Sequence, residues 1–498
     1  MKTTLLFLLL IITGSTVKSQ LTIYPAPEGS AKNEDFTVKV RAPKRNWQNL
    51  HCYPANVAAL RGTKTTIETS SFAYFDHDGP TEISITSNKE PVRSAKVRPI
   101  ARGIAHQING NTLTFTVNEP GYFSIEINGD IFHNLQLFIN PTEKEKPNAK
   151  DANVIYFGPG IHDIGKLNIG TGKTVYIAGG AIVNGSLSVN KANNVSIKGR
   201  GILTQLEMYQ SKGGPSNHKK PSPQHRNDEI TIEYAENVKV EGLIVLPKKY
   251  SILIGESKNV SIANFKSFSA GGNADGIDVF CSYDVNINNI FMRNADDCIA
   301  IYGHRWNYFG NTTKIKVSNA VLWADVAHPI LIGTHGDSDR PNTLSDMSFS
   351  NIDILDQQEN QMDYQGCLAL NAGDSNLISD IRFENIRVEQ IRKGQLVNLR
   401  IMFNRKYNTS VGRGIENIHF KDVSYHGNSI NPSIIAGYDP SHAIKNITFE
   451  NLYINGVVIS DQMQGKPAWY KTGDMANFYI GEHVENIKFI HSSDKKQQ

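Results

Sequence analysis

The sequence predicts an all-β protein, a right-handed parallel β-helix preceded by an N-terminal β-sandwich. From about residue 190 onward a short phrase returns, Asn or Asp followed by alternating apolar and polar residues. The first part of the chain has strand-like segments without that repeat, and a charged, proline-bearing run, Pro141–Pro147, separates the two parts. We therefore expect a sandwich over residues 20–145 and a helix over residues 150–498.

The N-terminus predicts export. Met1 and Lys2 precede the apolar stretch Leu5–Ile12, and small or modest residues follow at Val17–Ser19. This is the layout of a signal peptide, whereas a membrane span needs about 20 apolar residues. We expect residues 1–19 to be a signal peptide of a secreted or periplasmic protein without membrane insertion.

The predicted sandwich rests on strand-like segments separated by Pro, Gly and Asn. They include Phe36–Val40, Glu82–Thr86, Leu113–Val117 and Gly121–Ile127. Such spacing is typical of a β-sandwich. We expect this domain to close one end of the β-helix, because an uncapped coil exposes strand edges. The alternative is that it helps to shape the cleft.

The repeated phrase predicts one strand per coil. Spacings are about 22 to 25 residues in early copies and about 30 to 37 in later ones. Alternation buries one strand face, and Asn or Asp at the turns tolerates left-handed backbone. An antiparallel sandwich gives no reason for the phrase to return at coil length. The copies begin at Asn194, Asn237, Asn259, Asp284, Lys314, Asp346, Asp380, Asn417, Asn446 and Asn486.

Charge and cysteine usage exclude some classes. The 51 Lys and Arg nearly balance the 48 Asp and Glu, which gives no argument for nucleic acid or a strongly anionic partner. Four cysteines permit three pairings or serve as small buried residues, and they form no close cluster suited to zinc. They are Cys52, Cys281, Cys298 and Cys367.

Two acidic phrases lie about one coil apart. Asn273–Asp278 contains Asp275, and the next phrase carries Asp296 and Asp297. Stacked coils bring equivalent positions side by side, so we expect these three carboxylates to lie together. Neighbouring strand residues face opposite sides, so a shared site also requires a kink or turn at the Asp296–Asp297 pair.

Clustered carboxylates suit glycoside hydrolysis. Like charges raise one another's pKa, so one group holds a proton while another stays ionised, as acid and base require. Spacing alone equally permits a turn-forming ladder of Asp and Asn or a calcium site.

The motifs resemble those of glycoside hydrolase family 28, the polygalacturonases. Asn273–Asp278, Asp296–Ile301 and Ala327–Gly333 are similar to that family's ordered motifs around Asn-Thr-Asp, Asp-Asp and Gly-His-Gly. Over a longer span the chain also resembles family 49, the dextranases and isopullulanases, which place a β-sandwich before the same helix. Tyr156–Ile161 and Tyr176–Gly185 are similar to that family's opening coils.

The resemblance implies roles for the site residues. Asp296 would be the general acid, Asp275 and Asp297 would hold and deprotonate water, and His328 would support the acid or bind the sugar. Both families invert the anomeric centre without a cofactor or metal. His328 comes later than the family pattern expects, which Gly303–Asn311 explains if it bulges out as a loop.

The substrate prediction follows from a position at which this sequence differs from the polygalacturonase pattern. Polygalacturonases carry an Arg-Ile-Lys phrase after the histidine, which holds a uronate carboxylate. Here Gly366–Asn371 has no Lys or Arg, and Arg400 lies too far along the chain to take the place of that phrase. The resemblance therefore favours a neutral, dextran-like or other glycan, with pectin-type polygalacturonase activity as the alternative.

Further residues are candidates for binding sugar. The predicted loop Gly303–Asn311 combines an aromatic ring with hydrogen-bond donors and could bind a sugar; alternatively, it packs on its own side chains. Trp323 alternates with strand residues, so we expect it to lie in the core. The candidates are Asn273, His304, Arg305, Trp306, His335 and Asn371. We expect a monomer that acts on a polysaccharide, and two other hypotheses stand: a calcium-dependent polysaccharide lyase and a non-catalytic glycan-binding β-helix.

Overall fold

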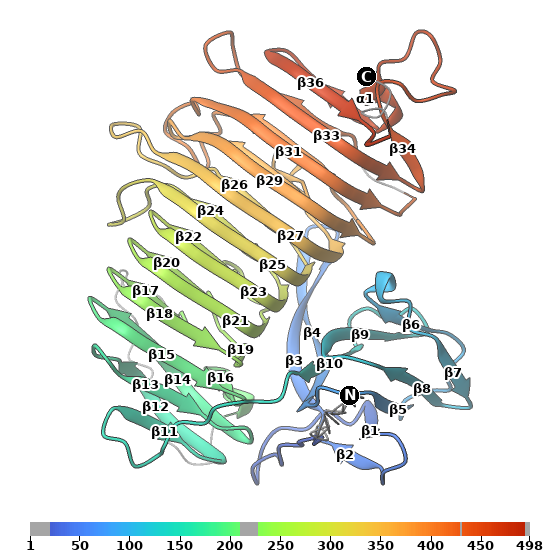
Figure 1. The fold of residues 1–498 in the computed structure, drawn as a ribbon, viewed down its shortest axis with the longest axis vertical. Coiled ribbons are helices and arrows are strands. Elements are labelled where there is room, and N and C mark those ends of the chain that lie inside the picture. The colour runs from blue at the N-terminus through green and yellow to red at the C-terminus, as the bar shows by residue number, and fades with distance from the viewer. Residues whose placement is uncertain (1–19, 210–227, 429–430, 494–498) are drawn as a thin grey trace, which may run out of the picture.

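The computed structural model describes residues 20–209, 228–428 and 431–493, and the predicted signal peptide lies outside them. Two five-stranded sheets precede a long stack of parallel strands, which confirms the predicted all-β parallel β-helix with a sandwich before it (Figure 1). None of the helices in the described ranges has the length and apolar character needed to cross a bilayer.

The sandwich has two facing sheets. Its first sheet, in spatial order, is β2 (Gln48–Leu50), β1 (Phe36–Arg41), β5 (Thr81–Ser87), β8 (Thr112–Val117) and β7 (His106–Asn109). Its second is β3 (Tyr53–Arg61), β4 (Lys64–Asp76), β10 (Leu135–Asn140), β9 (Gly121–Ile127) and β6 (Ala95–Arg98). Alternating apolar residues of both sheets fill the space between them.

The β-helix stacks its strands in parallel register from coil to coil. One row is β11 (Val154–Phe157), β13 (Thr174–Ile177), β15 (Asn193–Gly199), β18 (Glu236–Glu241), β21 (Lys258–Phe268), β23 (Tyr283–Asn294), β25 (Thr312–Ala324), β27 (Thr343–Gln357), β29 (Leu377–Val388), β31 (Gly414–Tyr425), β33 (Ile444–Ile454) and β36 (Val484–Ile490). The row that carries the acids is β12 (Gly160–Asn168), β14 (Ala181–Asn190), β17 (Ile230–Glu233), β20 (Ile252–Gly255), β22 (Ile277–Phe280), β24 (Ile299–Tyr302), β26 (Ile330–Gly333), β28 (Leu368–Ala372), β30 (Val397–Ile401), β32 (Ser433–Ala436) and β35 (Phe478–Ile480).

Short elements complete the fold. They are β16 (Ile202–Thr204), β19 (Ile244–Leu246), β34 (Val457–Ile459), the helix α1 (Thr472–Met475) and the 3-10 turns Ile100–Arg102, Glu207–Tyr209 and Met362–Tyr364.

The first residue of each repeated phrase lies near the start of a strand in the first row, from β15 to β36, where the backbone bends within the coil. All ten, from Asn194 to Asn486, have φ between 50° and 60°, the left-handed region that Asn and Asp tolerate. Their side chains also stack, since Asn237 Nδ2 donates to Asn194 Oδ1 at 3.1 Å and Asn486 Nδ2 to Asn446 Oδ1 at 2.7 Å. The repeat thus sets the position of this bend as well as the strand.

Inside the helix, equivalent apolar side chains stack along the axis. Phe349, Phe383, Phe420, Phe449 and Phe489 form one column with ring centroids 4.7 to 5.0 Å apart. All four cysteines are buried and free, so the core relies on packing without a disulfide between them.

The sandwich packs along the flank of the β-helix, so the expectation that it closes one end is wrong. The outer face of its second sheet meets residues of successive coils, from Ile182 through Phe268 and Phe291 to Leu355. Both faces of that sheet are therefore covered. A buried flank, rather than exposed strand ends, supplies the apolar area that holds the two parts together.

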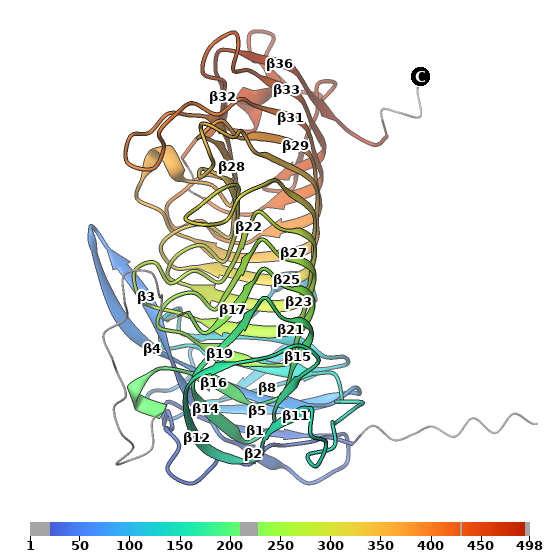
Figure 2. The same cartoon turned by 90° about the vertical axis from the view of Figure 1, so that its left-hand side faces the viewer.

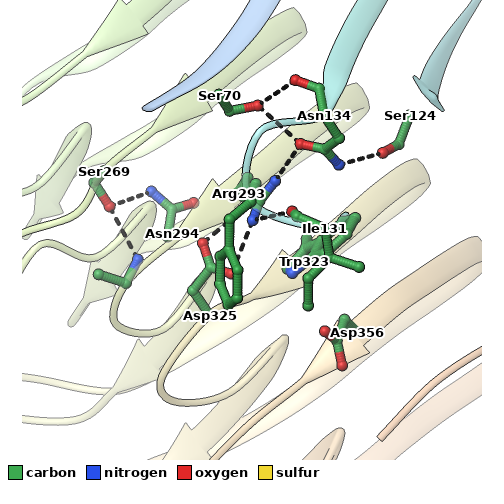
Figure 3. Close-up of polar contacts among 12 residues, drawn as sticks. Ser70, Ser124, Ile131, Asn134, Ser269, Arg293, Asn294, Trp323, Asp325 and Asp356 are labelled. Atoms are coloured by element: carbon green, nitrogen blue, oxygen red, sulfur yellow. Dashed lines mark hydrogen bonds and ion pairs between the residues drawn. The ribbon is translucent and has the colours of Figure 1, made fainter. Parts of the chain in front are cut away.

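Buried charges fix this contact. Arg293 is fully buried in β23, and its guanidinium binds the Asp325 carboxylate at 3.0 Å, Asn134 Oδ1 at 2.9 Å and the Ile131 carbonyl at 2.9 Å (Figure 3). Its Cζ lies 4.1 Å from the ring centroid of Trp323, which is fully buried as predicted. Since each of the three guanidinium nitrogens donates to a protein acceptor, the contact holds one orientation.

The β3–β4 hairpin reaches beyond the sandwich, beside the coils that carry the acids (Figures 1 and 2). At its tip, the Leu60 carbonyl accepts from Gln358 Nε2 at 3.0 Å and the Gly62 carbonyl from Asn360 Nδ2 at 2.6 Å. The hairpin therefore braces the connection between β27 and β28.

Candidate active site

Asp275, Asp297 and His328 stand at equivalent positions of three successive coils, just before β22, β24 and β26. Gly276 N donates to the Asp297 carbonyl at 2.7 Å, and Cys298 N to the His328 carbonyl at 2.8 Å. These bonds set the coil-to-coil register and place the three side chains one above another.

The backbone bends where the two aspartates need it. β23 ends at Asn294, β24 begins at Ile299, and a bend covers Ala295 and Asp296. The predicted kink at the Asp296–Asp297 pair is confirmed. A regular strand would have sent one of the two carboxylates into the core.

The three carboxylates form one cluster. An oxygen from each of Asp275, Asp296 and Asp297 lies within 4.8 Å of the others. Burial, and next the charge of Asp297, raise the pKa of Asp296 to about 6. Asp296 is thus suited to hold a proton, although the backbone N–H of Asn273 at 3.2 Å favours its ionised form.

Asp297 is held by donors on both oxygens. Its Oδ1 accepts from His328 N at 3.1 Å and lies 2.7 Å from His328 Nδ1, and its Oδ2 accepts from the Tyr302 hydroxyl at 3.2 Å. These donors hold the Asp297 side chain in one position. Asp296 and Asp297 are adjacent in sequence, but the pKa of Asp296 is raised while Asp297 is held by the His328 and Tyr302 side chains.

His328 is enclosed between Asp297 and the Tyr364 carbonyl, which receives its Nε2–H. Burial opposes a charged imidazole, but the charge and hydrogen bond of Asp297 outweigh it and raise the pKa of His328. Both ring nitrogens face acceptors, so the ring is held in one orientation and lends positive charge to the cluster.

Three residues at the site were missed by sequence reasoning. Tyr302 is buried at the end of β24, and Glu359 and Tyr364 lie in the connection before β28. Burial and the nearby charge of Asp297 raise the pKa of Tyr302, so its hydroxyl stays a donor. Burial likewise raises the pKa of Glu359, whose charge acts on His328. Tyr302 directly follows the Asp296–Ile301 phrase, and the strand alternation places it on the outward face, so the sequence could have indicated it. Nothing in the sequence indicates Glu359 or Tyr364.

The residues 303–311 form a loop between β24 and β25, as predicted. Trp306 is 41% exposed, and its ring lies 5.2 Å from Phe280, which stacks at 5.2 Å on Tyr302. Arg305 covers Trp306 at 4.7 Å. His304 stacks on Phe309 within the loop at 4.3 Å. An aromatic series therefore runs from the acids to the exposed Trp306.

The remaining candidates differ in access. The His335 ring is half-buried, 5.1 Å from Tyr302, next to the cluster. Asn273 is exposed and contacts Asp296 through its backbone. Asn371 is fully buried in β28 and donates to Asn398 Oδ1 at 3.3 Å.

This fold and this acid cluster define the class: a parallel β-helix protein of the glycoside hydrolase type. Residues 165–469 match the family described as "Glycosyl hydrolases family 28", and the chain belongs to that family. That range includes the three aspartates and His328.

Two relatives show the same relationship by sequence. The chain is 27% identical over 294 residues to "Probable endopolygalacturonase D" of Neosartorya fischeri, covering 58% of this chain and 56% of the relative. It is 24% identical over 283 residues to the "Polygalacturonase" of Chamaecyparis obtusa, covering 53% and 48%. The matched parts thus span about half the length of these relatives.

Solved structures confirm the fold. "Dex49A from Penicillium minioluteum" matches with a TM-score of 0.55 and 13% identity, over 95% of this chain and all of that one. The "Yersinia enterocolitica Family 28 Exopolygalacturonase" matches with a TM-score of 0.52 and 13% identity, over 83% and 97%.

Proposed function

We propose that this protein hydrolyses glycosidic bonds of a polysaccharide with inversion of the anomeric centre. The observation that carries the proposal is one cluster of three carboxylates in which Asp296 has a raised pKa and Asp297 is held by donors on both oxygens. General acid and base catalysis at a glycosidic bond requires an acid that can hold a proton next to a positioned carboxyl group.

In the proposed reaction Asp296 gives its proton to the leaving oxygen as the glycosidic bond breaks. Asp275 and Asp297, at equivalent positions of neighbouring coils, hold a water molecule and take its proton as it attacks the anomeric carbon. His328 and Tyr302 keep the Asp297 carboxylate in place through their hydrogen bonds.

The stereochemistry is open to a direct test. Carboxylates of inverting enzymes usually stand roughly 6.5–9.5 Å apart, and closer pairs are typical of retention. The cluster here is tighter, with the oxygens within 4.8 Å; membership of family 28 supports inversion. Proton NMR of the first-formed product distinguishes the two, and an unchanged anomeric configuration would refute inversion.

For the substrate we propose a neutral glycan. Strand β28, in the coil that follows His328, carries no Lys or Arg. Arg400, on β30 of the next coil, donates to Asp363 at 2.8 Å. A uronate carboxylate would need a free cation close to the cluster. The exposed Trp306 offers instead an aromatic surface, which suits the apolar face of a sugar ring.

A second candidate is a galacturonate chain. The curated relatives are named polygalacturonases, and the ion pair of Arg400, in which Asp363 is exposed, opens at little cost if a uronate replaces that partner. The neutral and acidic substrates therefore predict opposite results in one assay.

That assay measures product release from dextran, pullulan and polygalacturonate, with wild type and Asp296→Asn. Asp284→Asn is the matched control, since it removes the same charge at an exposed bend where other copies of the repeat carry Asn. Loss of cleavage in Asp296→Asn alone supports the proposal. Equal activity of all three proteins would overturn it.

We also propose the division into residues 20–145 and 150–498, a cleaved signal at residues 1–19, export from the cell and a monomeric state. Mass spectrometry of the mature N-terminus and light scattering in solution test these points.

A further inference from the structure

The outer face of the sandwich's first sheet carries a groove of about 720 Å³. Its lining includes Arg41, Trp47, Glu82, Arg102, Gln107 and Thr114. This sheet faces away from the β-helix, because the other sheet makes the contact with the coils (Figure 1). The groove is therefore separate from the carboxylate cluster and open to solvent.

The centre of the groove is a stacked, planar set of side chains. Arg41 Nε and Nη2 donate to Glu82 Oε2 at 2.8 and 2.5 Å, and the Arg41 Cζ lies 4.3 Å from the ring centroid of Trp47. Trp47 still exposes 39% of its surface. The Arg41–Glu82 ion pair is thus held in place by the sheet and by the Trp47 indole. A ligand would therefore meet hydrogen-bonding groups that are already positioned.

The charges of the groove are already matched. Arg41 pairs with Glu82, and Arg102 Nη1 pairs with Glu119 Oε1 at 2.8 Å. The rest of the lining contains no Asp, Glu, Lys or Arg; it supplies hydroxyl and amide groups, such as those of Thr114 and Gln107, together with the His106 imidazole and apolar side chains such as Ile104. A ligand rich in hydroxyls, with one apolar face and no net charge, fits this lining; an anion would have to compete with two carboxylates.

We propose that this groove is a second binding site, which takes a stretch of neutral glycan. A sugar ring packs its C–H face on Trp47, and its hydroxyls bond to Glu82, Gln107 and Thr114. Such a site holds the enzyme on its polysaccharide while the cluster acts on another segment. It goes beyond the proposed hydrolysis and does not depend on it, since binding here needs none of the three aspartates.

The test measures binding of full-length Asp296→Asn protein, chosen so that the proposed hydrolysis does not consume the glycan, to dextran, pullulan and polygalacturonate by affinity electrophoresis. Trp47→Ala and, separately, Gln107→Ala are added. Trp469→Ala is the matched control, since Trp469 is 82% exposed in the C-terminal part of the chain and outside the groove. Equal melting temperatures show that each variant is folded.

We expect Trp47→Ala to weaken retention by a neutral glycan by roughly tenfold or more, and Gln107→Ala by less. The control should bind as the parent does. In the active background, Trp47→Ala should leave kcat/KM on a short oligosaccharide unchanged. Three results would overturn the site: equal retention of the parent and both groove variants, retention by polygalacturonate alone, or no retention by any of the three glycans. None of these results depends on whether the hydrolase proposal holds.

Discussion

The hydroxyl of Tyr302 lies 3.2 Å from Oδ2 of Asp297. The ring of Tyr302 contacts two neighbouring rings, those of Phe280 at 5.2 Å and His335 at 5.1 Å. A packed aromatic side chain thus aims a single donor at the carboxylate proposed to activate water. Tyr302 touches a catalytic carboxylate rather than the reacting atoms, so we regard it as a positioning residue.

Replacing Tyr302 by Phe keeps the packing and removes that donor. Hydrogen bonds to charged groups contribute about 1.5–3 kcal/mol, so we expect kcat to fall roughly 10- to 100-fold with little change in KM. Tyr308→Phe is the control, because that hydroxyl, in the 303–311 loop, donates to Glu233 of β17 at 2.7 Å and not to an aspartate of the cluster. A loss of equal size in both variants, or a pure KM effect, would contradict the positioning role.

The proton on Asp296 predicts the alkaline side of the pH profile. Burial, then the charge of Asp297, raise the pKa of Asp296 to about 6, and only the protonated acid can serve the leaving oxygen. Activity should therefore be present below that pH and decline as pH rises through it. The profile of kcat/KM checks this, and a plateau extending to pH values about two units higher would exclude Asp296 as the acid.

Chelation separates hydrolysis from calcium-dependent elimination. The three carboxylates are close enough to share a cation, but donors already occupy both oxygens of Asp297, and calcium takes about six to eight oxygen ligands. We expect EDTA to leave activity unchanged. Loss of activity on chelation, recovery with Ca²⁺ and a product with ultraviolet absorption would favour the lyase.

The flank contact predicts a large stability effect. Arg293→Ala leaves the buried Asp325 carboxylate with Arg392, at 3.5 Å, as its remaining ion-pair partner among the residues that the structure describes. We therefore expect the free energy of unfolding to fall by about 3 kcal/mol. Arg340→Ala, which breaks an exposed pair with Asp337, should cost less than about 1 kcal/mol. Urea unfolding of both variants measures the difference, and similar values would show that the buried pair adds little.

The strands and the acid cluster were predictable because one local rule sets both. Asn or Asp in left-handed backbone marks the same place near the start of one strand in each coil, so residues a coil apart, such as Asp275 and Asp297, meet by register alone. Tyr302 follows the same alternation and was within reach of that reasoning. Glu359 and Tyr364 were not, because their connection is placed by tertiary contacts with Gly62 and His328. The position of the sandwich on the flank of the β-helix could not be predicted either, since local sequence does not show which neighbour covers the second face of a sheet.

The covered flank has a practical consequence for anyone who wishes to shorten this enzyme. A fragment starting near residue 150 would keep every residue of the acid cluster, yet it would present Ile182, Phe268 and Phe291 to water as one apolar strip and leave Arg293 without Asn134. Exposed strips of that kind promote self-association. The two parts are consecutive along the chain but share this buried contact, so we expect expression and directed evolution to succeed only from the intact pair.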